Sequence, residues 1–370
     1  MSSTVFYSPF NGFLNDNPPG TIITGVPGRG KTYLLLNIAA NALYTNSRVI
    51  FIDFKNDSRN LKYVDPNINM IDINEIEDGA LNPFRLINNV DTNTIMSIIE
   101  ILVGEISGEK ITAISPIVRD FVLKNERSSQ EVNFSQLANY LYASANTNAQ
   151  EIGTILKMNE DSRYGRLLFG KYLGKNKDQL SSFGDNESMV ISLLGMSFPS
   201  ATTSKKEMSH DERFTSAIVY IITRILMDTL SRDKSVPTAL IIDEAHVAYM
   251  SEPISRVINS FLTLGRSLKV ATVLASQNTS HFPENIGQFM SYKFTFKLSR
   301  QEAEMFVDKF DLTGLSSEDS YDSPIDVSSV ISGIMDLKKG ECFMIDSKNR
   351  VGFLKVYSNM GTGKDNPLHK

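Results

Sequence analysis

The chain has 370 residues, of which 41% are hydrophobic and 21% are charged, a balance that is typical of a folded globular protein and excludes a disordered chain. At about 150 residues per domain, this length predicts two to three folding units. The net charge of −5 excludes a global basic field that would hold the protein to nucleic acid.

Cysteine content and hydropathy indicate in which cellular compartment the protein is expected. Cys342 is the single cysteine, which excludes an intramolecular disulfide. We find neither a run of 18 apolar residues nor an apolar leader. We therefore expect a cytoplasmic protein, with a peripheral position at the inner face of the cell membrane, reached through a partner, as the alternative.

The first 80 residues alternate between strand and helix. Apolar runs predict strands at 20–24, 49–53 and 69–73, and helical spacing of apolar residues predicts a helix that includes 35–43. Such alternation is typical of a parallel sheet with crossover helices on its faces.

Residues 81–185 have a different pattern, in which helical periodicity is not interrupted by strands. The expected helix starts are Asp91 or Thr92, Ser115 before Pro116, Ser135, and Gln150. Gly104 would end the first of these helices, and a Gly/Lys/Asn-rich loop at 170–185 would close the segment. The sequence thus predicts a core formed by 1–80 and 186–370, with a mostly helical insertion at 81–185.

Alternation returns in the second half of the chain. Strands are predicted at 189–194, 239–242, 270–275 and 293–298, and helices at 211–230 and at 254–264 with an end at Gly265. A terminal hairpin is predicted at 340–357, with its turn near Asn349. His210 falls where the first of these helices starts.

Residues 25–32 read GVPGRGKT, a full match to G-x-x-x-x-G-K-[ST] between a predicted strand and a predicted helix. Glycines let the backbone curl so that its amides face phosphates. Lys31 is expected to reach the β and γ phosphates of ATP, and Thr32 to bind Mg²⁺. The alternative, a glycine-rich turn with a chance lysine, is disfavoured by the flanking strand and helix. The predicted nucleotide contacts are Gly25, Val26, Pro27, Gly28, Arg29, Gly30, Lys31, Thr32 and Tyr33.

The segment ALIIDEAH at 239–246 places two acids at the end of a buried strand. We expect Asp243 to hold the metal and Glu244 to polarise the water that attacks the γ phosphate. The letters DEAH also suggest a helicase, but only 124 residues follow His246, too few for a second domain with arginine-rich motifs. We therefore interpret His246 as a packing residue.

Two polar residues flank the predicted strand 270–275. Gln277 follows the strand, where its amide would point at the γ phosphate. Arg266 precedes the strand, and the span from 270 to 277 is roughly 23 Å, too long for this arginine to reach its own nucleotide. Arg266 is therefore either a helix C-terminal charge or a finger that acts on a neighbouring subunit.

Together with the phosphate loop, three further segments carry a family resemblance: FIDFKNDSRNL at 51–61, LNPF at 81–84 and GRSLKVATVLASQ at 265–277. With them, the chain resembles the TraC-like ATPases of type IV secretion and conjugation, within the FtsK/HerA group of RecA-like motors. The resemblance implies an α/β RecA-like P-loop NTPase fold, with a mostly parallel central sheet, a helical inserted subdomain and a C-terminal β-hairpin. It also implies a hexameric ring in the active state, in which Arg266 is the trans-acting finger and Gln277 senses the γ phosphate.

The chain departs from that family in two ways. Members usually carry a large docking domain before the ATPase core, whereas this phosphate loop begins at residue 25, as expected of an excised motor domain or a stand-alone relative. The sequence IDFK replaces the usual Asp-Pro-Lys, which leaves the roles of Asp53 and Lys55 open, with a buried strand-end carboxylate as the modest interpretation.

The predicted function is therefore a Mg²⁺-dependent ATPase that drives conjugative transfer or type IV secretion, with ATP, secretion-channel or coupling proteins and DNA as candidate partners. The alternative is a DNA translocase of the FtsK/HerA type or a viral genome-packaging ATPase. A nucleotide-regulated switch without hydrolysis is disfavoured by Glu244 and Gln277. Lys171, Lys175, Lys177, Lys205 and Lys206 would line a DNA pore or lie in solvated loops. Tyr7 and Phe10 would stack on adenine or pack on the core.

Overall fold

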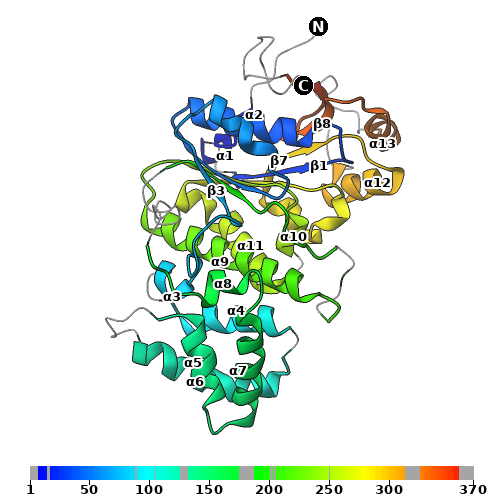
Figure 1. Cartoon of the computed structure of the whole chain (residues 1–370). Helices are drawn as coiled ribbons and strands as arrows, with labels where there is room; N and C mark the ends of the chain where they lie inside the picture. Colours follow the sequence, from blue (N-terminus) through cyan, green and yellow to red (C-terminus); the bar gives the residue numbers. More distant parts are fainter. Residues whose placement is uncertain are drawn as a thin grey trace.

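The computed structural model describes residues 7–14, 17–87, 90–104, 106–125, 132–174, 187–200, 203, 206–249, 251–312 and 326–357. Figure 1 shows a sheet-containing core with a group of helices that extends away from it on one side. The core contains the elements of both ends of the chain, and the extending helices come from its second quarter.

The core is built on a nine-stranded sheet with the order β3-β4-β2-β5-β6-β1-β7-β8-β9. All neighbouring strands are parallel except the last two pairs, β7–β8 and β8–β9, which are antiparallel. The strands are β1 (Gly20–Thr24), β2 (Arg48–Asp53), β3 (Asn69–Asp72), β4 (Met189–Ser192), β5 (Thr238–Ile242), β6 (Val270–Ala275), β7 (Met290–Thr295), β8 (Glu341–Ile345) and β9 (Val351–Lys355). This arrangement confirms the predicted mostly parallel α/β fold and its C-terminal hairpin.

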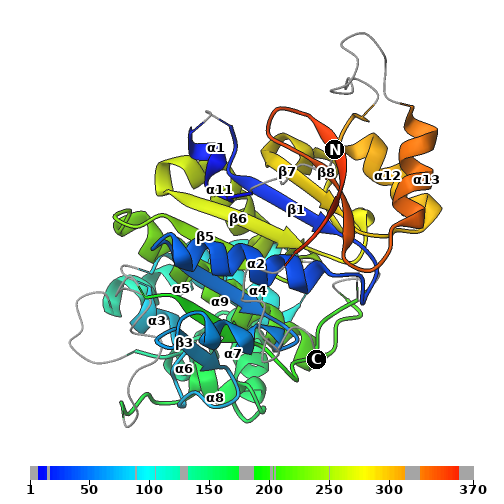
Figure 2. The ribbon, with the colours of Figure 1, turned by 90° about the horizontal axis from the view of Figure 1, so that it is seen from above.

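Helices cover both faces of the sheet, which explains why its central strands are apolar without alternation. Helix α2 (Lys31–Tyr44) lies on one face, and α9 (His210–Arg232) and α11 (Glu252–Leu268) lie on the other (Figures 1 and 2). Within β2, Val49 and Phe51 pack into the core under α2, whereas Ile50 and Ile52 pack into the core on the opposite face. Both faces of β2 are therefore buried.

Helix α9 also has the length and apolar character of a membrane-spanning helix, and among the described residues it is the one helix that does. However, 83% of its apolar window is buried inside the fold. Its position between the sheet and the helices of the insertion accounts for that composition (Figure 1).

The stretch between β3 and β4 is helical, with no strand among its described residues. Its helices are α3 (Pro83–Leu86), α4 (Thr92–Val103), α5 (Gly108–Asn125), α6 (Phe134–Tyr142), α7 (Thr147–Glu160) and α8 (Gly165–Phe169). Helix α4 contacts α9 of the core, and α5, α6 and α7 lie beyond it at the far end of the molecule (Figure 1). Asp91 caps α4 and Gly104 follows its end, as predicted.

Three predicted helix starts in this stretch are wrong. Gln150 does not open α7, which begins at Thr147 with Asn146 as its cap. Pro116 does not open a helix but lies inside α5, whose apolar face buries Val118 and Phe121. This packing offsets the backbone hydrogen bond that a proline removes. Ser135 does not cap α6, because Asn133 does so through a capping box with Gln136.

Two predicted boundaries in the second half also differ. Helix α11 does not stop at Gly265 but continues to Leu268, where Lys269 adopts a left-handed conformation with φ of 54° and ends it. Strand β7 runs over Met290–Thr295 rather than over 293–298. The polar side chain of Ser291 is buried near its start, and a pattern of hydropathy alone does not identify such a residue as part of a buried strand.

Among the described residues, four α-helices of the core were not foreseen: α1 (Asn11–Leu14), α10 (His246–Tyr249), α12 (Arg300–Lys309) and α13 (Val327–Asp336). Helices α12 and α13 lie together beside the β7–β8 end of the sheet (Figure 2). Ser209 caps α9 through a capping box with Glu212, so His210 is the first residue of that helix, as predicted.

Candidate functional site

The phosphate-loop sequence connects β1 to α2 with a backbone that requires glycine. Gly25, Gly28 and Gly30 have φ of 144°, 74° and 122°. A Cβ at Gly25 would lie 2.6 Å from Cβ of Phe296, and one at Gly30 would lie 2.9 Å from the ring of the same residue. The loop therefore curls against Phe296 in a way that a larger residue would prevent.

Neighbouring segments hold this loop by its backbone. The N–H of Gly25 donates to the carbonyl of Gln277 (3.3 Å), and the N–H of Val26 donates to the segment after β7 (3.0 Å). On the other side, the carbonyl of Arg29 accepts from the N–H of Gly340 (2.9 Å). The tip of the loop, Pro27 and Gly28, is exposed.

Lys31 is the first residue of α2 and is buried, with 6% of its surface exposed. Its ammonium donates to the carbonyls of Gly25 (2.5 Å) and Val26 (3.3 Å), inside the curl of the loop. Burial lowers the pKa of Lys31, while Glu244 raises it and the ammonium of Lys55 lowers it further. Thr32 and Tyr33 follow in the first turn of α2 and are half-buried.

Asp243 follows β5 directly and is 1% exposed. Its Oδ1 accepts the N–H of Glu244 (3.0 Å), whereas Oδ2 is buried and has no hydrogen-bond donor among the described residues. Burial raises the pKa of Asp243 to about 6. A buried carboxylate oxygen without a donor suits a cation, and a carboxylate together with a threonine hydroxyl is the oxygen set that Mg²⁺ prefers. Asp243 and Thr32 therefore fit the predicted metal role.

Glu244 has a left-handed backbone, with φ of 54°, which is a strained conformation for a residue other than glycine. Its Oε1 accepts from Nε2 of Gln277 (2.9 Å) and from Nζ of Lys55, and its Oε2 lies 3.3 Å from Nδ1 of His246. Burial acts to raise the pKa of Glu244, but these three contacts outweigh it and hold the pKa far below its usual value.

Sheet topology explains why these residues meet. Strands β2, β5, β6 and β1 are neighbours, and all four are parallel. The residues that follow them therefore gather at one edge, the place where open α/β sheets bind ligands. Lys31, Asp243, Glu244 and Gln277 are brought together there, as the sequence predicts.

Arg266 is not part of this group. It is exposed in the last turn of α11, before the start of β6. Because Gln277 follows the end of the same strand, the strand separates the two residues. Arg266 thus lies at the opposite edge of the sheet from the phosphate loop.

The segment after β2 supplies residues whose roles the sequence left open. Both carboxylate oxygens of Asp53 accept hydrogen bonds from the turn that follows, including the N–H groups of Lys55 (2.9 Å), Asn56 (2.7 Å) and Ser58 (2.8 Å). Asp53 is therefore a buried strand-end carboxylate that shapes this turn. From this turn, the side chain of Lys55 reaches the carboxylate of Glu244 and forms an ion pair with it.

Two histidines near the acid pair were not predicted as site residues. His246 faces Glu244, and its ring packs on that of His281 with 5.0 Å between centroids. His281 in turn hydrogen-bonds through Nδ1 to Oγ of Ser276 (2.7 Å), and burial lowers its pKa. The interpretation of His246 as only a packing residue is thus incomplete. Its position two residues after Glu244 was the available signal.

Other candidates from the sequence lie apart from the site. Tyr7 packs edge-on against Tyr292 and Phe294, and its hydroxyl is 2.6 Å from that of Thr21, so it packs on the core. Phe10 packs against Phe13. Of the lysines proposed for a pore, Lys171 and Lys206 are exposed, and Lys175, Lys177 and Lys205 lie outside the described residues.

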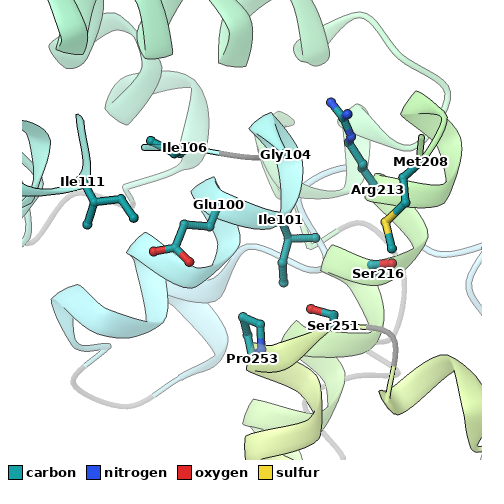
Figure 3. A pocket seen from close by; sticks show the side chains of 10 residues that line it. All are labelled: Glu100, Ile101, Gly104, Ile106, Ile111, Met208, Arg213, Ser216, Ser251 and Pro253. Atoms are coloured by element: carbon teal, nitrogen blue, oxygen red, sulfur yellow. The ribbon is translucent and has the colours of Figure 1, made fainter. Parts of the chain in front are cut away.

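A cavity of about 200 Å³ lies where the helical insertion meets the core. Figure 3 shows side chains from α4, α9 and the start of α11 around it, with the guanidinium of Arg213 on one side and the carboxylate of Glu100 on another. Its lining includes neither the phosphate loop nor Asp243, Glu244 or Gln277. This cavity is therefore separate from the phosphate-loop site.

Comparison with solved structures gives matches that cover most of the chain. VirB4 of Thermoanaerobacter pseudethanolicus is 13% identical, with a TM-score of 0.68 over 92% of this chain and 89% of that chain. The bacterial conjugative coupling protein TrwBdeltaN70 is 13% identical, with a TM-score of 0.56 over 93% and 86%. The plasmid coupling protein TrwB in complex with ADP and Mg²⁺ is 12% identical, with a TM-score of 0.57 over 95% and 88%.

These similarities confirm the predicted fold, which is that of VirB4 and of the conjugative coupling protein TrwB. No curated protein sequence matches the chain. The model of the AAA-like domain family, however, matches residues 11–359, nearly the whole chain. The protein therefore belongs to the AAA-like domain family.

Proposed function

We propose that the protein is an ATPase that hydrolyses ATP with Mg²⁺ and works as a motor of conjugative transfer or type IV secretion. The observation that carries the proposal is the buried pair Asp243 and Glu244 beside the phosphate loop. Asp243 presents a carboxylate oxygen without a donor, and Glu244 is oriented by Gln277. An acid pair with a purely structural role would not need a buried carboxylate oxygen that lacks a hydrogen-bond donor.

Each residue has a distinct role in this proposal. The loop amides and Lys31 would bind the β and γ phosphates, and Lys31 already lies inside the loop. Thr32 and Asp243 would hold Mg²⁺, which neutralises charge on the phosphates. Glu244 would orient the attacking water, and Gln277 would contact the γ phosphate from the end of β6.

We propose further that Arg266 completes the site of a neighbouring subunit in a hexameric ring. Its exposed position, across the sheet from its own phosphate loop, supports a role in trans. An arginine that enters from the next subunit would stabilise charge on the γ phosphate and make turnover depend on assembly. The division into a core of 1–80 and 186–370 with an insertion at 81–185 is part of the same proposal.

The work that ATP turnover drives is proposed from the proteins of similar fold. VirB4 and the conjugative coupling protein TrwB favour conjugation or secretion, with channel or coupling proteins as partners. The proposed location is the cytoplasm, with a peripheral position at the inner face of the cell membrane as the alternative. A DNA translocase would use the same catalytic residues and is the second candidate.

Steady-state ATP hydrolysis with double-stranded DNA, with single-stranded DNA and with neither separates these functions, measured across salt concentrations with Glu244→Gln as the blank. A rate that DNA does not change supports a secretion ATPase that acts on protein components. Stimulation by DNA that falls steeply with salt supports a translocase instead, because phosphate contacts are salt-sensitive. Absence of hydrolysis above the blank under all conditions would contradict both.

A further inference from the structure

The cavity between the helical insertion and the core is bordered by a cation with few hydrogen-bond partners. Arg213 lies near the start of α9 and lines this cavity, and its guanidinium carries several N–H donors. Within the described part of the chain, it donates to the carbonyl of Val103 (3.1 Å), and its buried Nε has no acceptor. The guanidinium therefore retains unused capacity to bind an anion.

The backbone of the insertion fixes the position of this guanidinium. Gly104, which follows α4, has φ of 93°, and a Cβ there would lie 2.8 Å from Cζ of Arg213 and 3.0 Å from each of its terminal nitrogens. The guanidinium is thus packed directly against the glycine backbone while it donates to Val103. A charge that is held in place before a ligand binds loses little entropy on binding.

A second polar group, Ser251, lines the same cavity. It is 6% exposed and stands at the N-cap of α11, but its side chain makes no capping hydrogen bond. In Figure 3 its oxygen points toward Ile101 and Pro253, which line the cavity as well. A buried serine at a helix start commonly accepts from a first-turn amide, so an unused hydroxyl at this position suits a ligand instead. The N-terminus of α11 also adds a partial positive charge.

The remaining wall of the cavity determines what kind of anion fits. It is mostly apolar, with side chains of Ile101, Ile106, Ile111, Met208 and Pro253. The carboxylate of Glu100 lies on another side of the cavity from Arg213 (Figure 3). Because Glu100 repels a second negative charge, the cavity disfavours phosphate and other multiply charged anions. It suits a molecule with one anionic end, directed to Arg213, and an apolar body.

The volume of the cavity limits the size of that molecule. It measures about 200 Å³. Since an apolar cavity of roughly 150 Å³ accommodates benzene, this one has room for a molecule of about eight non-hydrogen atoms. A nucleotide is far too large for it.

We propose that this cavity is a binding site for a small monocarboxylate with a hydrocarbon body. The carboxylate accepts hydrogen bonds from Arg213 and from the hydroxyl of Ser251, and the hydrocarbon packs on the apolar wall. Such a ligand contacts α4 of the insertion together with α9 and the start of α11, so it braces the insertion against the core. The proposal does not depend on ATP hydrolysis, because the lining contains none of the residues assigned to the nucleotide.

Titration of the full chain with hexanoate and with benzoate, followed by the methyl NMR signals of isoleucine and methionine, tests the proposal. Saturable shifts are expected for Ile106, Ile111 and Met208, with a dissociation constant of about 1 mM or lower. Met227, farther along α9, should not shift. Hexanol has a similar body without the charge and should bind about tenfold more weakly or worse.

Variants identify the groups that hold the carboxylate. Arg213→Met is expected to weaken hexanoate binding by about tenfold or more and to leave hexanol binding nearly unchanged, which separates a lost charge contact from a damaged cavity. Ser251→Ala should weaken hexanoate binding about threefold to tenfold. Arg232→Met, at an exposed arginine in the last turn of the same helix, is the matched control and should change neither affinity.

The proposal would be overturned if neither hexanoate nor benzoate gave saturable shifts at these methyl groups. Equal affinities for hexanoate and hexanol would also overturn it, because Arg213 would then contribute nothing to binding. Shifts that spread over the molecule without saturation would contradict it as well, since they indicate binding to the surface only. If Arg213→Met does not fold, the hexanol comparison and Ser251→Ala decide the question.

Discussion

The side-chain amide of Gln277 donates to Oε1 of Glu244 over 2.9 Å, although 33 residues separate the two in the chain. They meet because β5 and β6 are adjacent and parallel, with Ile242 in register with Leu274. The carbonyl of Gln277 also accepts the N–H of Gly25. One residue thus connects the phosphate loop to the acid pair, and the register of the sheet sets this contact.

Replacement of Asp243 by Asn is expected to stabilise the protein in the absence of nucleotide and Mg²⁺. Burial raises the pKa of Asp243 from 3.8 to about 6, so the folded state loses stability as pH rises through this range and the carboxylate ionises. At pH 7.5 the variant should gain about 1–3 kcal/mol in urea unfolding with EDTA present.

The pH dependence of that gain is its own control. At pH 5 the wild-type carboxyl is largely protonated, so the gain from Asn should shrink, and below pH 3.8 it should vanish. A stability difference that stays constant from pH 5 to pH 7.5 would show that ionisation of Asp243 is not its cause.

Mixed assemblies test whether Arg266 acts on the nucleotide site of a neighbouring subunit. Arg266→Ala and Lys31→Ala are each expected to reduce ATP turnover by about 100-fold or more on their own. If the arginine acts on a neighbouring subunit, a mixture should recover part of the activity, because some sites then combine an intact loop with an intact arginine. The measurement is steady-state hydrolysis across mixing ratios, in assemblies shown to contain both variants. No recovery would assign Arg266 a structural role.

Gly265 is expected to be required for packing rather than for chain flexibility. A Cβ there would lie 2.6 Å from the carbonyl of Val270 and 2.8 Å from Cγ of Pro19, neither of which can easily move. Gly265→Ala should therefore lower the free energy of unfolding by about 1–3 kcal/mol. Gly108→Ala, where nothing lies within 4 Å, should change it by less than about 1 kcal/mol. Equal effects of the two substitutions would contradict the packing argument.

The sequence predicted most of this architecture because its signals were local. The phosphate-loop motif lies between a strand and a helix, and unbroken apolar runs identified buried strands such as β5 and β6. Residues after parallel strands share one edge of the sheet, so Asp243, Glu244 and Gln277 were expected to converge once those strands were identified.

What the sequence could not predict depends on tertiary contacts. The end of α11 is set by the left-handed backbone of Lys269, whereas the expected stop, Gly265, serves a close approach to Pro19. Pro116 lies at an exposed position inside α5, whose helix is held by buried residues such as Val118 and Phe121. The pairing of Lys55 with Glu244 depends on the adjacency of β2 and β5, which neither local segment encodes.

The most direct test of the account measures ATP affinity and phosphate release on the same samples of wild type, Lys31→Ala and Glu244→Gln, with Mg²⁺ present. The wild type is expected to bind and hydrolyse ATP, and Lys31→Ala to lose tight binding. Glu244→Gln should bind ATP at least as tightly as the wild type, and its rate of phosphate release should be lower by about 100-fold or more. A wild-type rate in Glu244→Gln, or unchanged ATP affinity in Lys31→Ala, would contradict the assignment of this site.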